Sequence, residues 1–220
     1  MRENKLVLVA VGATLIMACN GEPNFLDPGP GDLANERTQA EMHFLRQSDE
    51  MLPVVSFDGD GSAPQAGGLE TYSDSFWAIK GKETSLEIEY ANGEDFLDFE
   101  VGKESLWRRP DGSEIEWGDS ILITVTVDSV LLLVELQPSG LMFNPYRPAE
   151  LEISYAAADP DFNGDGVVDW KDAEIERNRL AMWMQQEETD PWHVQRSEQD
   201  IEDRTFTGWL LHFSNYAVSW

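Results

Sequence analysis

Short runs of alternating apolar and polar residues fill most of the chain's C-terminal part, and turn-forming residues separate them. In 85–91, Leu86 and Ile88 share one face, whereas Glu87 and Glu89 share the other. A period of two residues is typical of a β-strand with one buried and one wet face. The pattern predicts ten strands, over 75–81, 85–91, 95–102, 121–128, 130–137, 150–156, 179–186, 191–195, 206–214 and 216–220.

The connections between these runs indicate how the strands pair. Asn92-Gly93 lies between two of them and is typical of a tight β-hairpin turn. The run 130–137 is apolar on both faces, which predicts a central strand. Short connections and little helix favour an antiparallel sandwich or barrel. We predict an all-β fold, an antiparallel β-sandwich with one short helix, forming a single domain over 70–220.

The first 18 residues read as an export signal. Arg2 and Lys5 precede an apolar stretch ending at Met17, too short to span a membrane comfortably. Cys19, the one cysteine, follows, so no disulfide can form within a chain. This order resembles the bacterial lipoprotein signal, which implies that Cys19 is lipidated and anchors the chain in a membrane. The alternative is an ordinary signal peptide or anchor with a free thiol.

Residues 19–69 are expected to form a flexible tether, because proline, glycine and Asp are frequent at its start. A short helix is predicted over 33–47, and 58–68 reads as another loop. Asn20 stands where an Asp would favour retention in the inner membrane, so the resemblance implies an outer-membrane destination.

An acidic segment, 161-DFNGDGVVDWKD-172, has the spacing of a calcium loop. Calcium takes six to eight oxygen ligands, and the EF-hand loop supplies them from positions 1, 3, 5, 7, 9 and 12. Gly166 falls at position 6, where the chain must turn sharply. The predicted ligands are Asp161, Asn163, Asp165, the backbone carbonyl of Val167, Asp169 and Asp172.

The loop departs from an EF-hand in two respects. Asp172 replaces the usual Glu at position 12, as in dockerins, which the loop resembles. A helix is predicted over 170–178, but a strand precedes the loop, and only one such loop is present where a dockerin needs two. We expect Ca²⁺ to order the insert 159–178, because four carboxylates repel one another without a cation. Magnesium could compete, and the alternative is an Asx-rich turn with no ion.

Around this insert the chain resembles the Z-U-five domain, a β-sandwich module of ankyrins, netrin receptors and bacterial surface lipoproteins. The matching residues are Pro138-Ser139-Gly140-Leu141, Pro148-Ala149 and His212-Phe213-Ser214, within about 104–219. The resemblance implies a structural or protein-interaction module and not an enzyme. The acidic insert is a departure, because a short hairpin would be usual there.

The charge balance restricts the partners. Forty-two acidic residues against 15 basic ones give a formal net charge of −27. Such a surface repels nucleic acids and anionic lipids and attracts cations.

The search for catalytic residues finds no phosphate loop, dinucleotide fingerprint, zinc pattern or nucleophile elbow. His212 and Ser214 could belong to a catalytic set, but a packed or hydrogen-bonded His212 is the expectation. We therefore predict no enzymatic activity. Eight tryptophans suggest a carbohydrate-binding module as the alternative function. Core positions are expected for Trp77, Trp183 and Trp209, and a shared exposed face is sought among Trp107, Trp117 and Trp170.

Overall fold

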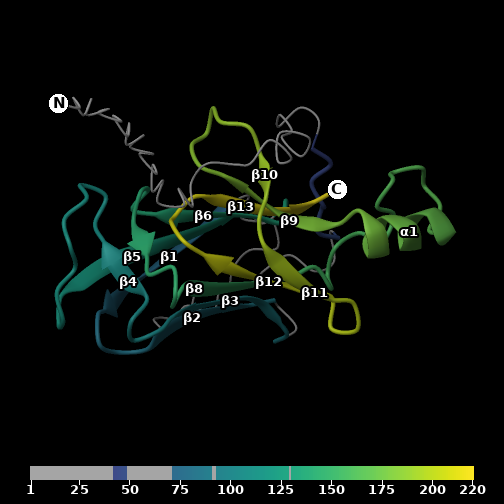
Figure 1. The fold of residues 1–220 in the computed structure, drawn as a ribbon. Coiled ribbons are helices and arrows are strands. Elements are labelled where there is room, and N and C mark those ends of the chain that lie inside the picture. Colours follow the sequence, from purple (N-terminus) through teal and green to yellow (C-terminus); the bar gives the residue numbers. More distant parts are fainter. Residues whose placement is uncertain (1–41, 49–70, 91–92, 129) are drawn as a thin grey trace, which may run out of the picture. The chain divides into compact units, whose positions relative to one another are not determined.

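The computed structural model describes residues 42–48, 71–90, 93–128 and 130–220 (Figure 1). All of them belong to the compact unit Asn35–Trp220. The predictions for the export signal, for Cys19 and for the loop at 58–68 lie outside the described residues. Within the described ranges, no helix is long and apolar enough to cross a membrane.

Six strands form the larger of two main sheets. All neighbouring strands in it are antiparallel. Its first strand in the sequence, β1, and its last, β13, are not adjacent in the sheet. In spatial order the strands are β1 (Thr71–Ile79), β5 (Ser120–Asp128), β6 (Leu133–Gln137), β13 (Asn215–Ser219), β9 (Ala181–Gln185) and β10 (His193–Val194).

Five antiparallel strands form the smaller sheet. In spatial order they are β11 (Ser197–Asp200), β12 (Thr205–Leu210), β8 (Ala149–Ser154), β3 (Asp95–Val101) and β2 (Thr84–Glu89). A separate pair is made by β4 (Leu106–Arg108) and β7 (Met142–Phe143).

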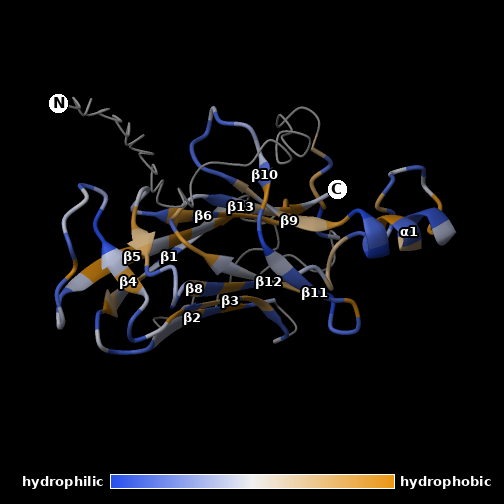
Figure 2. Ribbon diagram, in the orientation of Figure 1, coloured by the Kyte–Doolittle hydropathy of each residue, from blue (hydrophilic) through white to orange (hydrophobic). Residues whose placement is uncertain are grey.

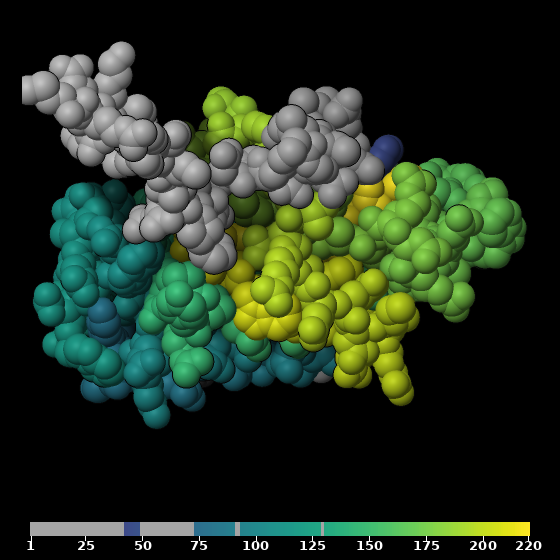
Figure 3. Space-filling model, viewed as in Figure 1, coloured from purple at the N-terminus to yellow at the C-terminus, as the bar shows by residue number. Residues whose placement is uncertain are grey.

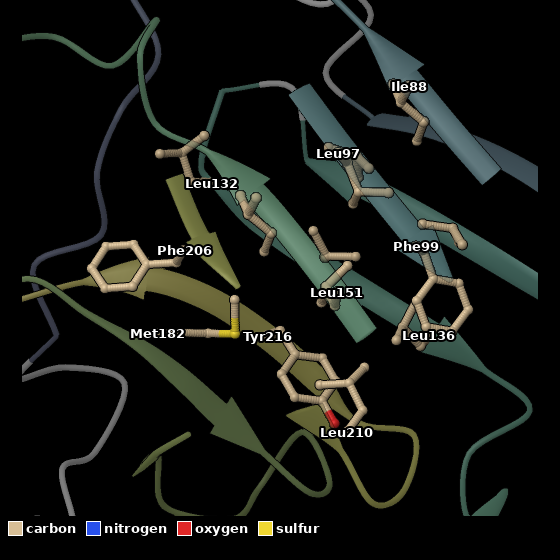
Figure 4. Packing of buried hydrophobic residues seen from close by; sticks show 14 of the residues in the cluster. Ile88, Leu97, Phe99, Leu132, Leu136, Leu151, Met182, Phe206, Leu210 and Tyr216 are labelled. Carbon is tan, nitrogen blue, oxygen red and sulfur yellow. The ribbon is translucent and has the colours of Figure 1, made fainter. Parts of the chain in front are cut away.

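The hydrophobic core lies between the two main sheets. Figure 4 shows Leu151 and Phe99 of the smaller sheet near Leu136 and Tyr216 of the larger one. All four side chains are at most 1% exposed. Figure 2 shows the matching alternation of apolar and polar residues along the strands. The predicted all-β sandwich is therefore confirmed.

The strand predictions succeed where the pattern has a period of two. Gly93 ends the turn of the predicted β2–β3 hairpin with a φ of 81°, a conformation that favours glycine. The run at 130–137 contains β6, which lies in the interior of its sheet as predicted. Three strands were not predicted, namely β4, β7 and β11, because they are short or polar.

The helix predicted over 33–47 is wrong for its described part. Phe44 bridges to Ser219 and Arg46 to Leu131, so this segment is extended and not helical. Leu45 is only 3% exposed and packs in the main core. Residues 42–48 therefore belong to the packed domain, although the sequence placed them in the tether. Pairing with the rest of the fold overrides the local helical preference.

One helix, α1 (Trp170–Asn178), follows the acidic loop, with the bounds that the sequence predicts. Figure 1 shows the loop and α1 at one end of the sheets, beyond β9 and β11. In the space-filling view the same segment forms the projection at the right (Figure 3). Its buried contact with the core is Ile175, which is 5% exposed.

Candidate metal centre

The acidic loop connects β8 to α1, and its last residues begin the helix. Asp169 is the N-cap: its carboxylate accepts a hydrogen bond of 2.8 Å from the backbone N–H of Lys171. In return, Asp172 accepts one of 2.8 Å from the backbone N–H of Asp169. Such a reciprocal capping box satisfies N–H groups that have no partner within the helix. Two predicted calcium ligands therefore also fix where α1 begins.

Asp161 organises the turn at the start of the loop. Its carboxylate accepts hydrogen bonds from the N–H of Asp165, at 3.1 Å, and of Gly166, at 2.7 Å. Gly164 and Gly166 have φ angles of 69° and 83°, which L-residues rarely adopt. A Cβ at either glycine would meet no atom within 4 Å, so backbone conformation and not space requires glycine here.

Asn163 and Asp165 continue the same pattern. The side-chain oxygen of Asn163 accepts from the N–H of Asp165 at 2.8 Å, and Asp165 accepts from the N–H of Val167 at 3.0 Å. The amide nitrogen of Asn163 is buried without a hydrogen-bond partner. The side-chain oxygens at positions 1, 3 and 5 therefore point toward the loop's own backbone.

Asp172 joins the two ends of the loop. It is 3% exposed, and besides Asp169 it accepts a hydrogen bond of 3.2 Å from the N–H of Asn163. The N–H of Asp169, and then that of Asn163, lower the pKa of the Asp172 carboxyl. Position 12 is thus a buried carboxylate that two backbone N–H groups hold in place.

Lys171 was not predicted to take part in this site. Its ammonium lies 2.8 Å from Asp165 and 3.8 Å from Asp169. The hydrogen bond between Lys171 and Asp165 lowers the pKa of Asp165 and raises that of Lys171. The available signal was the position of this lysine, between ligand positions 9 and 12 of the loop. A cationic side chain therefore partly offsets the charge of the predicted ligands.

The ligand set fits calcium in chemistry but is not gathered around one point. Among the described residues, no three His, Cys, Asp or Glu side chains are arranged to hold a metal ion. The six predicted donors are all oxygens, which suits a hard cation. A carboxylate has two oxygens and can accept a backbone N–H while it binds a cation, so Asp161 and Asp165 would keep these hydrogen bonds, whereas Lys171 would withdraw from Asp165.

Phe162 attaches the loop to the sandwich. Its side chain packs against the main core, and its carbonyl accepts a 3.2 Å hydrogen bond from the Trp220 indole. The Trp220 ring is stacked on His43, with centroids 4.3 Å apart, and the Arg179 guanidinium lies 4.2 Å from its centroid. The loop thus contacts the C-terminal residue, which in turn contacts the segment 42–48.

The expected core positions of three tryptophans are mostly wrong. Trp77 is 57% exposed, because it lies on the outward face of the edge strand β1. Trp209 is half-buried on the outward face of β12, where the Arg196 guanidinium covers it at 5.6 Å. Trp183 is buried, but in a second cluster with Met42 and Trp192 on the outward face of the larger sheet.

The other three tryptophans come from separate elements. Trp117 is 65% exposed in the turn before β5, and Trp170 is 70% exposed at the start of α1. Trp107 in β4 is half-buried beneath the guanidinium of Arg108, 4.7 Å from its ring centroid. The ring of Trp117 lies against Gly81, where a Cβ would come within 2.7 Å of it.

His212 is hydrogen-bonded, as expected. Its Nδ1 lies 2.9 Å from the hydroxyl of Ser214, and burial lowers its pKa. Ser214 is 4% exposed. Burial therefore favours the neutral form of the imidazole, which forms a mostly buried pair with Ser214.

Comparisons with protein-family models, with curated proteins and with solved structures give no match. The resemblances to lipoproteins, to the Z-U-five domain and to dockerin loops therefore remain predictions, which rest on the residues quoted for them.

Proposed function

We propose that the protein is a lipid-anchored protein of a bacterial envelope and that its sandwich is a non-catalytic binding module. The proposal of an anchor rests on the export signal that ends at Cys19. The proposal of a binding module rests on the Z-U-five resemblance and on the lack of catalytic motifs in the sequence. A lipid at Cys19 would hold the domain at a membrane surface, on the outer membrane by the argument from Asn20.

The module is further proposed to bind one calcium ion in the acidic loop. One observation carries this proposal: Asp161 accepts the N–H of Gly166 at 2.7 Å, so the loop is bent at the position where a calcium loop must bend. The ends of the loop are also joined through Asp172. Binding would require the ligand side chains to converge on the ion, while the bend and the joined ends of the loop are already present.

The role of the ion would be structural. The carboxylates of Asp161, Asp165, Asp169 and Asp172 lie within twelve residues of chain, and Lys171 contributes one positive charge among them. A divalent cation would offset two more negative charges and order the loop that leads into α1. Phe162 would transmit that order to Trp220.

Calorimetric titration of calcium into the chelator-treated chain from residue 20 onward tests the proposal. We expect about one ion per chain, and no binding by an Asp165→Ala, Asp172→Ala variant. A matched control is Glu202→Ala, Asp203→Ala, which removes two exposed carboxylates from the β11–β12 turn. Equal binding by all three proteins, or no heat in any, would exclude a specific calcium loop.

The lipid anchor is tested separately. Full-length chain expressed in a Gram-negative host should partition with membranes, and Cys19→Ser should move it to the soluble fraction. Membrane association that survives Cys19→Ser would contradict lipidation at this cysteine.

A further inference from the structure

A row of polar side chains crosses the outward face of the larger sheet. The strand register places Ser73 opposite Thr126, Thr126 opposite Glu135, Glu135 opposite Asn215, and Asn215 opposite Gln185. Residues directly opposite on neighbouring strands share one face. The accessible row therefore runs over β1, β5, β6 and β13, a width of about 14 Å for strands about 4.8 Å apart, and it ends on β9 at Gln185, which is 4% exposed.

A second row lies two residues further along the same strands. Ser75 is opposite Thr124, and Thr124 is opposite Gln137. The hydroxyls of Ser75 and Thr124 are 2.8 Å apart. Beyond this row Trp77 lies opposite Leu122, and its ring is 57% exposed. We name these two rows, together with Trp77, the polar strip.

A hollow of about 600 Å³ lies at the far end of the strip from Trp77. Glu135, Gln137 and Asn215 of the strip line it on one side, and the β9–β10 connection lines it on the other. Gln185 holds that connection by donating hydrogen bonds to the carbonyls of Glu188, at 3.0 Å, and Asp190, at 2.8 Å. The volume is within the range of small-ligand sites, about 300–1,000 Å³.

Trp192 forms part of the wall of this hollow. It is 1% exposed, and its indole N–H has no hydrogen-bond partner. Buried donors without a partner are rare. A ligand oxygen would supply the missing acceptor, provided that the connection at 186–190 shifts to admit it.

The charge of the hollow limits what it can hold. Glu135, Glu187 and Glu188 line it, and no Lys, Arg or His does so among the described residues. Phosphates and carboxylates would be repelled. An ammonium or guanidinium group could meet the carboxylates but cannot accept the Trp192 N–H. A hydroxyl can do both, since it donates to a carboxylate and accepts from an indole.

We infer that the polar strip and its hollow bind a neutral oligosaccharide. Sugar hydroxyls would exchange hydrogen bonds with the amides of Gln137 and Asn215, with the hydroxyls and with Glu135, and the apolar face of a sugar ring would stack on Trp77. This inference deepens the proposal of a non-catalytic binding module and does not depend on calcium. The sequence suggested Trp107, Trp117 and Trp170 as the tryptophans that could stack on a sugar, whereas this inference assigns that role to Trp77.

The test measures binding of uncharged hexasaccharides, namely cellohexaose, xylohexaose and mannohexaose, to the chain from residue 20 onward by calorimetry. We expect binding of at least one, no binding of hexagalacturonic acid, and affinity about tenfold weaker for Trp77→Ala and for Gln137→Ala. Matched controls are Trp117→Ala and Trp170→Ala, which remove tryptophans that are somewhat more exposed than Trp77 and lie elsewhere. Trp77→Phe should keep most of the affinity.

Three outcomes would overturn the inference: no binding of any neutral hexasaccharide, binding that Trp77→Ala leaves unchanged, or binding that Trp117→Ala removes equally. Circular dichroism of each variant checks that it folds. Chromatography of the sugar after binding tests the two proposals separately. Shortened products would contradict the proposal of a non-catalytic module, but they would not contradict sugar binding by the polar strip. Binding that persists in chelator is expected, because the strip and the calcium loop are different sites.

Discussion

Lys171 sets the charge balance of the acidic loop. Its ammonium occupies one side of Asp165 at 2.8 Å, so a calcium ion must displace it before Asp165 can bind. The ion pair is about half-exposed, so solvent screens it and its contribution is small. The lysine should therefore tune calcium affinity without preventing binding.

Lys171→Gln is expected to strengthen calcium binding by only a few-fold, because solvent screens the ion pair that the ion would replace. The measurement is the calorimetric Kd at low ionic strength. Arg177→Gln, which removes an exposed base from the last turn of α1, is the control and should change the Kd less. Unchanged or weaker binding in Lys171→Gln would mean that the lysine does not compete with the ion.

Among the elements, the smaller sheet has an unusual outward face. Glu87 lies opposite Asp98, and Asp98 opposite Glu152, so three carboxylates cross β2, β3 and β8 in one row. Like charges directly opposite destabilise a sheet. Desolvation, and then the charges of Glu87, Glu100 and Glu152, raise the pKa of Asp98 above its ordinary value of 3.8.

Asp98→Asn should therefore stabilise the domain at pH 7, by about 0.2–1 kcal/mol. The raised pKa means that the folded chain binds this proton more tightly than the unfolded chain, so ionisation of Asp98 destabilises the fold. That cost disappears as the pH falls through the folded-state pKa toward 3.8. Urea unfolding at pH 7 and near pH 4 measures both values, and the difference between variant and wild type should shrink at the lower pH.

Asp203→Asn is the matched control, since Asp203 is an exposed carboxylate in the β11–β12 turn. A stabilisation of equal size there would assign the effect to net charge and not to the carboxylate row.

The segment 42–48 also acts as an element of the domain. Leu45 is 3% exposed, its N–H donates to Val218, and its carbonyl accepts from Leu132. Leu45→Ala should lower the free energy of unfolding by about 2–5 kcal/mol, as for other buried leucines. Urea unfolding measures it, with the exposed Arg46→Ala as control. If Leu45→Ala lowered the free energy of unfolding by less than Arg46→Ala does, the segment would not be part of the folded domain.

The sequence predicts the strands whose environment is regular. In β2 and β3 one face meets the core and the other meets water, so their alternation identifies them. It cannot identify 42–48, because that segment pairs with residues far along the chain. It also misplaces Trp77, since an apolar run does not say whether a strand lies at the edge or in the interior.

The candidate site was predictable in part for a similar reason. Ligand spacing and the glycine at position 6 are local properties, and the loop bends at Gly166 as they require. Whether Asp165 faces an ion, a backbone N–H or Lys171 depends on competition among charges, which spacing alone does not settle. The polar strip could not be predicted, because its residues share a face only through the pairing of five strands.

At the scale of the whole molecule, a net charge of −27 makes every cation stabilising to some degree. A specific calcium site should exceed this general effect. At a free calcium concentration of 100 times the Kd, binding to the folded state alone adds about 2.7 kcal/mol to the free energy of unfolding. Thermal unfolding in calcium, in magnesium and in sodium chloride of equal ionic strength measures the difference.

The Asp165→Ala, Asp172→Ala variant separates the two contributions. It should respond to sodium chloride as the wild type does and lose the extra stabilisation by calcium. If the unfolding temperatures of both proteins shifted equally in all three salts, the effect of calcium would be charge screening and not binding at a specific site.

The place of β13 in the larger sheet has a consequence for biosynthesis. This strand is the last of the described strands to be made, yet it lies between β6 and β9. The larger sheet therefore cannot be completed until the ribosome has passed Ser219. Until then, the edges of β6 and β9 that pair with β13 have no partner. Such late closure keeps the chain open during synthesis, which would suit the proposed export, since an exported chain crosses the membrane before it folds.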